Sequence, residues 1–333
     1  MRITREVLLK LAQDTANQRA RADMDILAVY LHGSLLDEEP LLGGTADIDL
    51  FIVRNDEPAV EREVVRISDE VHLDITHHSR KLYRQTRELR LHPWQGPLLY
   101  GCKILYDPQH FMDFTQASVR GQFNRPDQVL GRVKPQVEHA RQIWQSLSSS
   151  KDPTGRETVM YYLRAVGLVA NAVAGLSGKP LTERRFLIEF PHRAAAVGHP
   201  GLYPGLLGLL GGPMVDATDI RAWVLGWHQA VEALQGDPTP PRLSSPRIPY
   251  YSRAFEAILD SDQPLGVLWP LLRTWTEAVS LLPEDSPASV PWKEAVTRIG
   301  LLGDTFTAKL AALDAYLDQV EELLEDWARE NGA

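Results

Sequence analysis

The most constraining feature of this chain is a Gly-Ser pair followed by two aspartates that are separated by one residue. Gly33 and Ser34 end a short apolar run, residues 26–31, whose composition is typical of a β-strand. Asp47 and Asp49 lie in a second apolar run farther along the chain. Side chains at i and i+2 of a strand point to the same face, so we expect both carboxylates to project from one face of a sheet.

Two carboxylates that converge on one face repel each other unless a cation lies close to both. Proteins hold Mg²⁺ with one or two carboxylates together with the phosphates of a substrate. The Gly33-Ser34 pair suits those phosphates, because it offers exposed backbone N–H groups, little side-chain bulk and one hydroxyl donor. These residues predict a site for Mg²⁺ and a phosphorylated ligand. The alternative is a plain turn followed by two solvent-facing strand residues.

The arrangement resembles the DNA polymerase β-like nucleotidyltransferase superfamily, whose hallmark is Gly-Ser, a spacer and then Asp-x-Asp. The resemblance covers roughly residues 20 to 110. Thr45 departs from the pattern, since the family more often has Ser before the first Asp. The resemblance implies that Asp47 and Asp49 are Mg²⁺ ligands and that Gly33 and Ser34 bind the phosphates of a nucleoside triphosphate.

Family members have a third carboxylate on a neighbouring strand, and residues 71–76 offer one. This segment alternates apolar and polar residues, which predicts a half-buried strand with His72, Asp74 and Thr76 on the face of the site. The resemblance implies that Asp74 is the third metal ligand and takes the proton of the acceptor hydroxyl. A plain exposed strand carboxylate is the alternative for Asp74. His72 lacks companions with zinc-site spacing and is read as a polar neighbour of the site.

In the mechanism that the family implies, two Mg²⁺ ions bridge the triphosphate and position the acceptor oxygen for in-line attack on the α-phosphorus. Relatives often place a basic residue from the following helical domain against the phosphates. Lys179 and Arg184 lie in a basic turn before a predicted helix and are the candidates here, with a solvated turn as the alternative. Arg54 is a further candidate. ATP is expected as the donor from its frequency in the family, since no residue here identifies the base.

The predicted fold class is α+β. We expect a small mixed β-sheet nucleotidyltransferase domain with flanking helices at 1–125 and an all-α helical bundle at 126–333. In the first domain the patterns predict strands at 26–31, 48–53, 71–76 and 103–108, helices at 6–22 and 57–70, and a short helix after Ser34. In the second they predict helices at 128–147, 156–176, from 182, 219–234, 252–259, 265–282 and 291–331.

Composition narrows the class of protein. With 333 residues, 44% hydrophobic and 24% charged, the chain has the values of an ordinary globular protein with two domains. The single cysteine, Cys102, excludes an internal disulfide and is expected to be a buried structural thiol, which fits a reducing cytoplasm. The patterns predict no membrane span and no signal peptide, so we expect a cytoplasmic location.

Charge separates the candidate acceptors. Residues 1–150 carry 19 Lys and Arg against 21 Asp and Glu, a net of −2, whereas residues 151–333 carry 16 against 23, a net of −7. Nucleic acid binding normally needs a basic face, so this balance makes nucleic acid an unfavoured partner. The two-domain plan and acidic second half resemble the aminoglycoside-type nucleotidyltransferases, which implies a small cationic acceptor. The acidic residues of 314–330 are read as a solvated helix face.

Other functions stay open at this level. The chain could be a toxin-like or regulatory nucleotidyltransferase that acts on a protein or tRNA, or it could make a nucleotide signal. It could also be a nucleotide-binding regulator without turnover. Asp47, Asp49 and Asp74 together favour an enzyme, because clustered carboxylates are costly to keep without a use for them. The sequence does not indicate an oligomeric state.

Overall fold

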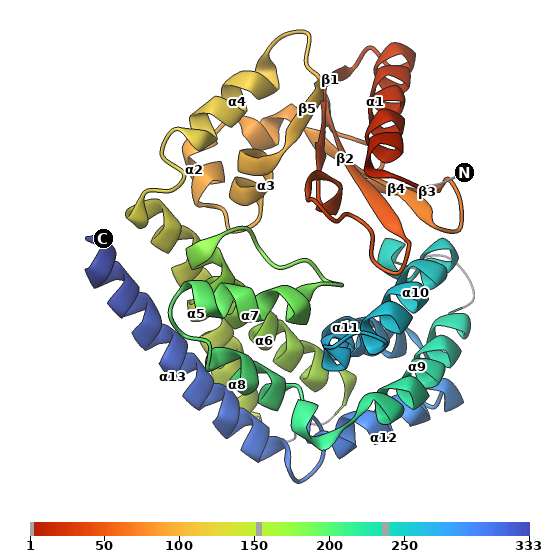
Figure 1. Cartoon of the computed structure of the whole chain (residues 1–333), viewed down its shortest axis with the longest axis vertical. Coiled ribbons are helices and arrows are strands. Elements are labelled where there is room, and N and C mark those ends of the chain that lie inside the picture. The colour runs from red at the N-terminus through yellow and green to blue at the C-terminus, as the bar shows by residue number, and fades with distance from the viewer. Residues whose placement is uncertain (1–2, 151–154, 235–239) are drawn as a thin grey trace. The chain divides into compact units, whose positions relative to one another are not determined.

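The structure is a computed structural model that describes residues 3–150, 155–234 and 240–333. It confirms the α+β class, with a five-stranded mixed sheet near the N-terminus and helices through the remainder (Figure 1). The chain forms two compact units, the first Met1–Gln128 with Pro249–Ala254 and the second Val129–Ile248 with Phe255–Ala333. The sequence placed a single division between residues 125 and 126. The segment Pro249–Ala254 therefore joins the first unit from a distant part of the chain.

The sheet of the first unit has the strand order β3-β4-β2-β1-β5. Strands β2 and β4 run parallel, and the other neighbours are antiparallel. The predicted strands at 26–31, 48–53, 71–76 and 103–108 all appear, with slightly different ends. Their bounds are β1 Ile26–His32, β2 Ala46–Arg54, β3 Arg62–Arg66, β4 Val71–Ser79 and β5 Lys103–Tyr106.

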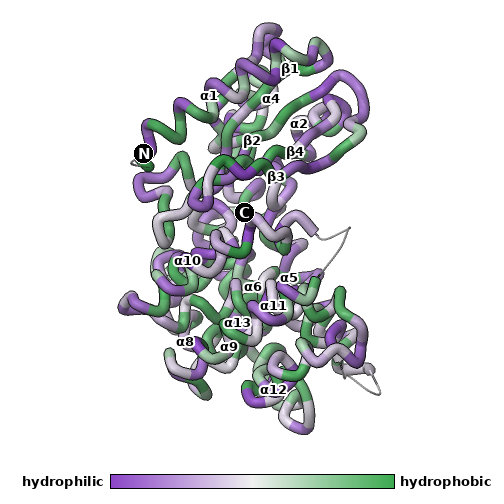
Figure 2. The backbone as a smooth tube through the Cα atoms, turned by 90° about the vertical axis from the view of Figure 1, so that its right-hand side faces the viewer, coloured by the Kyte–Doolittle hydropathy of each residue, from purple (hydrophilic) through white to green (hydrophobic). Residues whose placement is uncertain are grey.

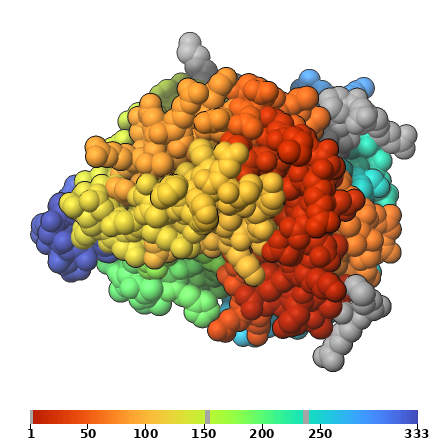
Figure 3. All heavy atoms as spheres, turned by 90° about the horizontal axis from the view of Figure 1, so that it is seen from above, coloured from red at the N-terminus to blue at the C-terminus, as the bar shows by residue number. Residues whose placement is uncertain are grey.

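Helix α1, Arg5–Ala22, covers one face of this sheet. Its buried residues Leu8, Ala12, Ala16 and Ala20 recur every four positions, so one stripe packs on the apolar face of the strands. In Figure 2 the tube of α1 alternates hydrophobic and hydrophilic colours accordingly. In Figure 3 the red residues that include α1 lie beside the yellow residues that include α4. Short helices cover part of the opposite face of the sheet. These are α2 Thr86–Leu91, α3 Gln95–Gly101 and α4 Phe111–Arg120, with single 3-10 turns at Ser34–Leu36 and Arg80–Tyr83.

Two predictions for the first unit are wrong. Residues 57–70 were expected to be a helix, but they contain the edge strand β3, which pairs antiparallel with β4. Val64 and Val65 are β-branched and pack well in a strand, and pairing with β4 outweighs the weak helical pattern. For residues 93–101 the sequence patterns predict a connector without a helix, but Gln95–Gly101 is helix α3.

The second unit is helical. Its helices are α5 Pro126–Ser149, α6 Arg156–Ser177, α7 Phe186–Ala196, α8 Leu202–Leu209, α9 Ala217–Glu232, α11 Leu268–Leu281, α12 Val290–Arg298 and α13 Phe306–Asn331. Helix α5 begins in the first unit, and α10 Ile248–Leu259 is divided between the units. Single 3-10 turns lie at Gly212–Met214, Pro241–Leu243, Ser245–Arg247, Pro264–Val267 and Pro287–Ser289. The side chains of Trp227, Trp269, Trp275 and Trp292 are buried and belong to the core of this unit.

Several helix bounds in this unit differ from the prediction, two of them substantially. The helix expected from Thr182 begins at Phe186 instead, without a side-chain cap. The helix expected over 291–331 is two helices, α12 and α13, because the chain turns at Gly300, whose φ is +77°. The predicted break at 148–153 and the start of the 236–249 loop lie partly outside the described residues.

Helix α6 is long and apolar enough to cross a membrane by length and composition, which the sequence patterns had not indicated. In the structure 72% of its apolar window is buried inside the protein. Small residues allow this close packing, since a Cβ on Gly167 would lie 2.7 Å from the Trp269 ring of α11. The apolar residues of α6 are therefore used for packing within the second unit.

The acidic helix α13 is not simply a solvated face. Arg141 of α5 donates hydrogen bonds to Asp314, Asp318 and Glu321, and its guanidinium lies over the Trp144 ring. The carboxylates raise the pKa of Arg141 above its ordinary value, Glu321 most of all. Arg141 thus neutralises part of the negative charge of residues 151–333, and its ion pairs connect α5 with α13.

Buried polar groups lie in and beside the core between the sheet and helices α2–α4. The hydroxyls of Tyr30 and Tyr83 are 2.9 Å apart, and Tyr83 lies 2.6 Å from Nδ1 of His78. Burial lowers the pKa of His78 to about 4. The Cys102 thiol donates to the Leu99 carbonyl in the same core, and burial raises its pKa to about 12, as expected of a structural thiol.

Because His78 stays neutral when folded, the protein should lose stability as the pH falls from about 6.5 to about 4. In that window the unfolded chain binds a proton at this residue and the folded chain does not. We expect His78→Gln to flatten this pH dependence of the free energy of unfolding by about 2–3 kcal/mol. Urea denaturation at pH 4 to 7 measures it. His110→Gln is the control, because that exposed histidine has a raised pKa. Equal slopes in both variants and the wild type would contradict the prediction.

Candidate active site

The register of strands β2 and β4 brings the predicted carboxylates together. In this parallel pair Asp49 lies opposite Asp74, and Asp47 lies opposite His72. Neighbouring strands are about 4.8 Å apart, so Asp49 and Asp74 are adjacent. Asp47 lies two residues before Asp49 and shares its face. Three carboxylates therefore project from one face of the sheet at the ends of the strands nearest to Gly33.

The three carboxylates are unequally buried. The side chains of Asp47 and Asp74 are almost completely buried, whereas Asp49 is partly exposed. Burial of a carboxylate is unfavourable unless hydrogen bonds or cations compensate its charge. The buried carboxylates on this face therefore need hydrogen bonds or cations beside them.

Position 33 requires glycine, because the Asp49 carboxylate leaves no room for a side chain there. His32, the last residue of β1, pairs with Asp49 of β2, so Gly33 begins its turn beside that carboxylate. Gly33 has φ +87° and ψ −168°, a combination open essentially to glycine alone. A Cβ there would lie 1.9 Å from Oδ2 of Asp49. Ser34, partly exposed, starts the 3-10 turn that follows, which ends at Leu36 instead of continuing to Glu39.

Arg62 is a member of the site that the sequence patterns did not reveal. Its Nε donates to Oδ1 of Asp74 at 2.7 Å, and its Nη2 donates to Oδ2 at 2.5 Å. The patterns predict a helix over residues 57–70, and in a helix Arg62 would not lie next to β4. Only a strand in the register of β3 brings it there. The β-branched pair Val64 and Val65 was the available signal.

The segment Pro249–Ala254 adds a second unforeseen element to the first unit. The Tyr250 ring meets the buried His72 ring edge-on, with 6.3 Å between centroids. Arg253 forms an ion pair of 3.0 Å with Glu70, and a Cβ on Gly43 would lie 2.1 Å from the Arg253 carbonyl oxygen. The loop before β2 and the start of β4 therefore pack on this segment.

The donor atoms fit Mg²⁺ in kind, since all three carboxylates supply hard oxygen ligands. In the present side-chain arrangement, the described part of the chain holds no group of three or more His, Cys, Asp or Glu residues placed to bind a metal ion. Asp74 is instead held by Arg62. The metal-ligand roles of Asp47, Asp49 and Asp74 stay predictions.

Two of the predicted basic residues are in the other unit. Lys179 and Arg184 belong to the second unit, in the connection between α6 and α7, where Arg184 is buried and Lys179 is half-buried. Their contact with a triphosphate stays a prediction. Arg54 forms ion pairs of 2.7 Å with Asp23 and 3.1 Å with Asp25 at the far end of β2, so a phosphate role for it is disfavoured.

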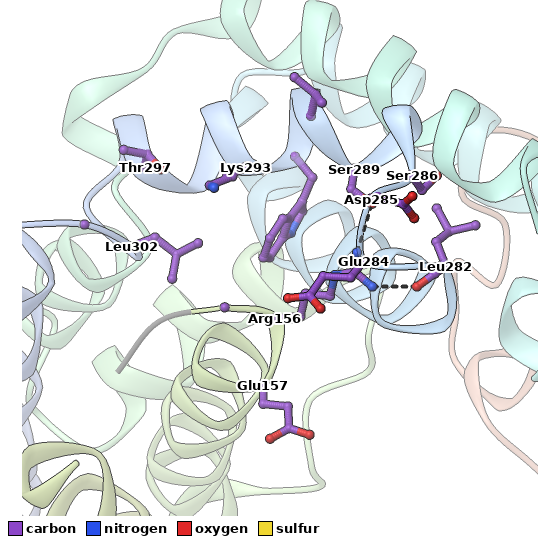
Figure 4. A pocket seen from close by; sticks show the side chains of 14 residues that line it. Arg156, Glu157, Leu282, Glu284, Asp285, Ser286, Ser289, Lys293, Thr297 and Leu302 are labelled. Atoms are coloured by element: carbon purple, nitrogen blue, oxygen red, sulfur yellow. Dashed lines mark hydrogen bonds between the residues drawn. The ribbon is translucent and has the colours of Figure 1, made fainter. Parts of the chain in front are cut away.

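The second unit also contains an open cavity of about 1080 Å³ (Figure 4). It lies among the start of α6, the end of α11, α12 and the turn after α12. Arg156 is held at its edge by the carbonyls of Leu282 and Pro283. None of the predicted site residues lines this cavity. Its lining residues include the carboxylates of Glu157, Glu284 and Asp285 and the ammonium of Lys293.

Comparison with known proteins gives little further information. No protein-family model matches the chain, and no curated protein matches it in sequence. Among solved structures, the chain is similar to a nucleotidyltransferase-like protein from Exiguobacterium sibiricum 255-15. The identity is 11% and the TM-score 0.30, over 94% of this chain and 91% of that chain. A likeness of that size carries no argument about the site, which depends on the strand register and side chains described above.

The contact between Gly33 and Asp49 gives a stability test. We expect Gly33→Ala to lower the free energy of unfolding by about 1–3 kcal/mol, since the backbone is strained for alanine and Asp49 must move. Urea denaturation measures the change. Gly44→Ala is the matched control, because Gly44 also has a positive φ but its Cβ would meet nothing within 4 Å. An equal cost at both positions would show that Asp49 is not displaced.

Proposed function

We propose that this protein is an Mg²⁺-dependent nucleotidyltransferase that moves a nucleoside monophosphate, AMP from ATP, to a hydroxyl of a small acceptor. The observation that carries the proposal is the register of β2 with β4. In this register the carboxylates of Asp47, Asp49 and Asp74 project from one face of the sheet, beside the Gly33-Ser34 turn. Carboxylates clustered next to a turn with exposed backbone N–H groups suit a metal bound to phosphate.

Each residue has a role in the proposed reaction. Asp47 and Asp49 would hold Mg²⁺, which when bound would neutralise phosphate charge and stabilise the pyrophosphate leaving group. Gly33 and Ser34 would orient the phosphates through backbone N–H groups and the Ser34 hydroxyl. Asp74 would accept the proton of the acceptor hydroxyl. The acceptor oxygen forms a bond to the α-phosphorus, and the bond from that phosphorus to the bridging oxygen of the β-phosphate breaks.

The acceptor is proposed to be small and cationic or neutral. Support comes from the net charge of −7 on residues 151–333, which disfavours a polyanion. Part of that charge is neutralised by Arg141, so the attraction for a cation is weaker than the sequence count indicates. Modification of a protein or tRNA would be a different outcome of the acceptor experiment below.

The metal ligands are tested by Asp49→Asn. We expect pyrophosphate release from labelled nucleoside triphosphates with Mg²⁺ and a panel of acceptors to fall by about 10³-fold or more, because one metal ligand is lost. The control is Asp69→Asn, which removes an exposed carboxylate of the β3–β4 turn. Circular dichroism shows whether each variant is folded. Turnover of Asp49→Asn near the wild-type rate would refute the assignment.

The acceptor is tested by binding titrations of a polyamine antibiotic and of a tRNA at low and moderate salt. We expect antibiotic affinity to fall as ionic strength rises, because screening acts over about 8 Å at physiological salt. The tRNA should bind weakly at both salt concentrations. Tight tRNA binding with a steep salt dependence, and no antibiotic binding, would replace the small-molecule acceptor with tRNA.

A further inference from the structure

Both oxygens of Asp74 are engaged by one guanidinium. Arg62 reaches Oδ1 and Oδ2 through its Nε and Nη2, the fork geometry that makes Arg–carboxylate pairs strong. The Asp74 side chain is only 4% exposed, whereas that of Arg62 is 44% exposed. The pair therefore joins a buried anion to a partly exposed cation.

The position of Arg62 on an edge strand leaves its side chain room to move away from Asp74. It lies on β3, the edge strand, and its partner in the β3–β4 ladder is Thr76. The side chain reaches Asp74 diagonally, a distance that long side chains can span. Release of the guanidinium would leave the backbone pairing of β3 with β4 intact.

Charge explains why a cation is needed there. Asp49 and Asp74 are neighbours in the register, and Asp47 lies on the same face. Without a cation, mutual repulsion and burial would make three adjacent carboxylates unfavourable. Arg62 compensates the charge of Asp74 in this structure. Its guanidinium occupies the two Asp74 oxygens that a metal ion would need.

We propose that Arg62 is a built-in counter-ion that holds Asp74 while the site lacks metal and is displaced from it when a divalent metal binds. This inference depends on the proposed function, because it assumes that Asp74 is a metal ligand. Metal and guanidinium compete for the same oxygens, so Arg62 lowers the metal affinity of the free protein. It also keeps the buried carboxylate compensated between turnovers.

The test is a titration of the full-length chain with Mn²⁺ in the absence of nucleotide. Electron paramagnetic resonance measures the free Mn²⁺ at each step. We expect Arg62→Met to bind Mn²⁺ at least about fivefold more tightly than the wild type, since the competing cation is gone. Its melting temperature without metal should be lower than that of the wild type, and Mn²⁺ should raise it by more. Arg62→Lys keeps the charge but loses the fork, so its affinity should lie between the two.

Matched variants isolate the effect. Arg66→Met removes a cation from the same strand, where Arg66 pairs with the exposed Asp69, and should leave Mn²⁺ affinity unchanged. In an Asp74→Asn background, Arg62→Met should have no further effect on Mn²⁺ affinity. Gains of equal size in Arg62→Met and Arg66→Met would reflect net charge alone and would overturn the proposal.

The remaining outcomes separate this inference from the proposed function. If Asp47→Asn and Asp49→Asn lose Mn²⁺ binding while Arg62→Met and Arg62→Lys bind as the wild type does, Arg62 is a permanent partner of Asp74 and only this inference fails. If Asp47→Asn and Asp49→Asn bind Mn²⁺ as the wild type does, the face is not a metal site and both proposals fail.

Discussion

The parallel pairing of β2 with β4 is the constraint on which the rest of the candidate site depends. It sets Asp49 beside Asp74, and Asp47 on the same face, so the electrostatic problem of the site arises directly from the strand register. The neighbouring features follow from that problem. Gly33 lacks a side chain where the Asp49 carboxylate lies, and Arg62 supplies a positive charge to Asp74. A shift of one residue between β2 and β4 would place Asp47 and Asp49 on the opposite face of the sheet from Asp74.

The sequence predicted the parts of the sheet that carry strong local signals. Apolar runs ending at Gly33 and surrounding Asp47 and Asp49 give β1 and β2, and strict alternation gives β4. The prediction of a helix over residues 57–70 is wrong because their apolar spacing fits a helix or a strand about equally well. Pairing with β4 decides between the two, and that is a non-local interaction. Arg62 was missed for the same reason, since its role exists only after the register is known.

Long-range packing was beyond local patterns in a second way. Tyr250 and Arg253 lie far along the chain from His72 and Glu70, yet they contact these residues within the first unit. Such contacts leave no periodic trace in the sequence. The charge of α13 is similar, because a sum over residues cannot show that Arg141 neutralises Asp314, Asp318 and Glu321. Net charge therefore overstated the acidic surface available to a cationic ligand.

The Arg62–Asp74 pair also changes what the carboxylate cluster means. Clustered carboxylates taken alone favour an enzyme, because unpaired they would destabilise the fold. A buried carboxylate that has a bidentate arginine partner is compensated without metal, so the fold can keep Asp74 at a smaller cost in stability. Asp49 is partly exposed, and its carboxylate lies where a side chain at Gly33 would be, since a Cβ there would be 1.9 Å from Oδ2 of Asp49. The proposed metal site therefore depends more on Asp49, whose carboxylate lies beside the Gly33 turn, than on Asp74, which Arg62 already compensates.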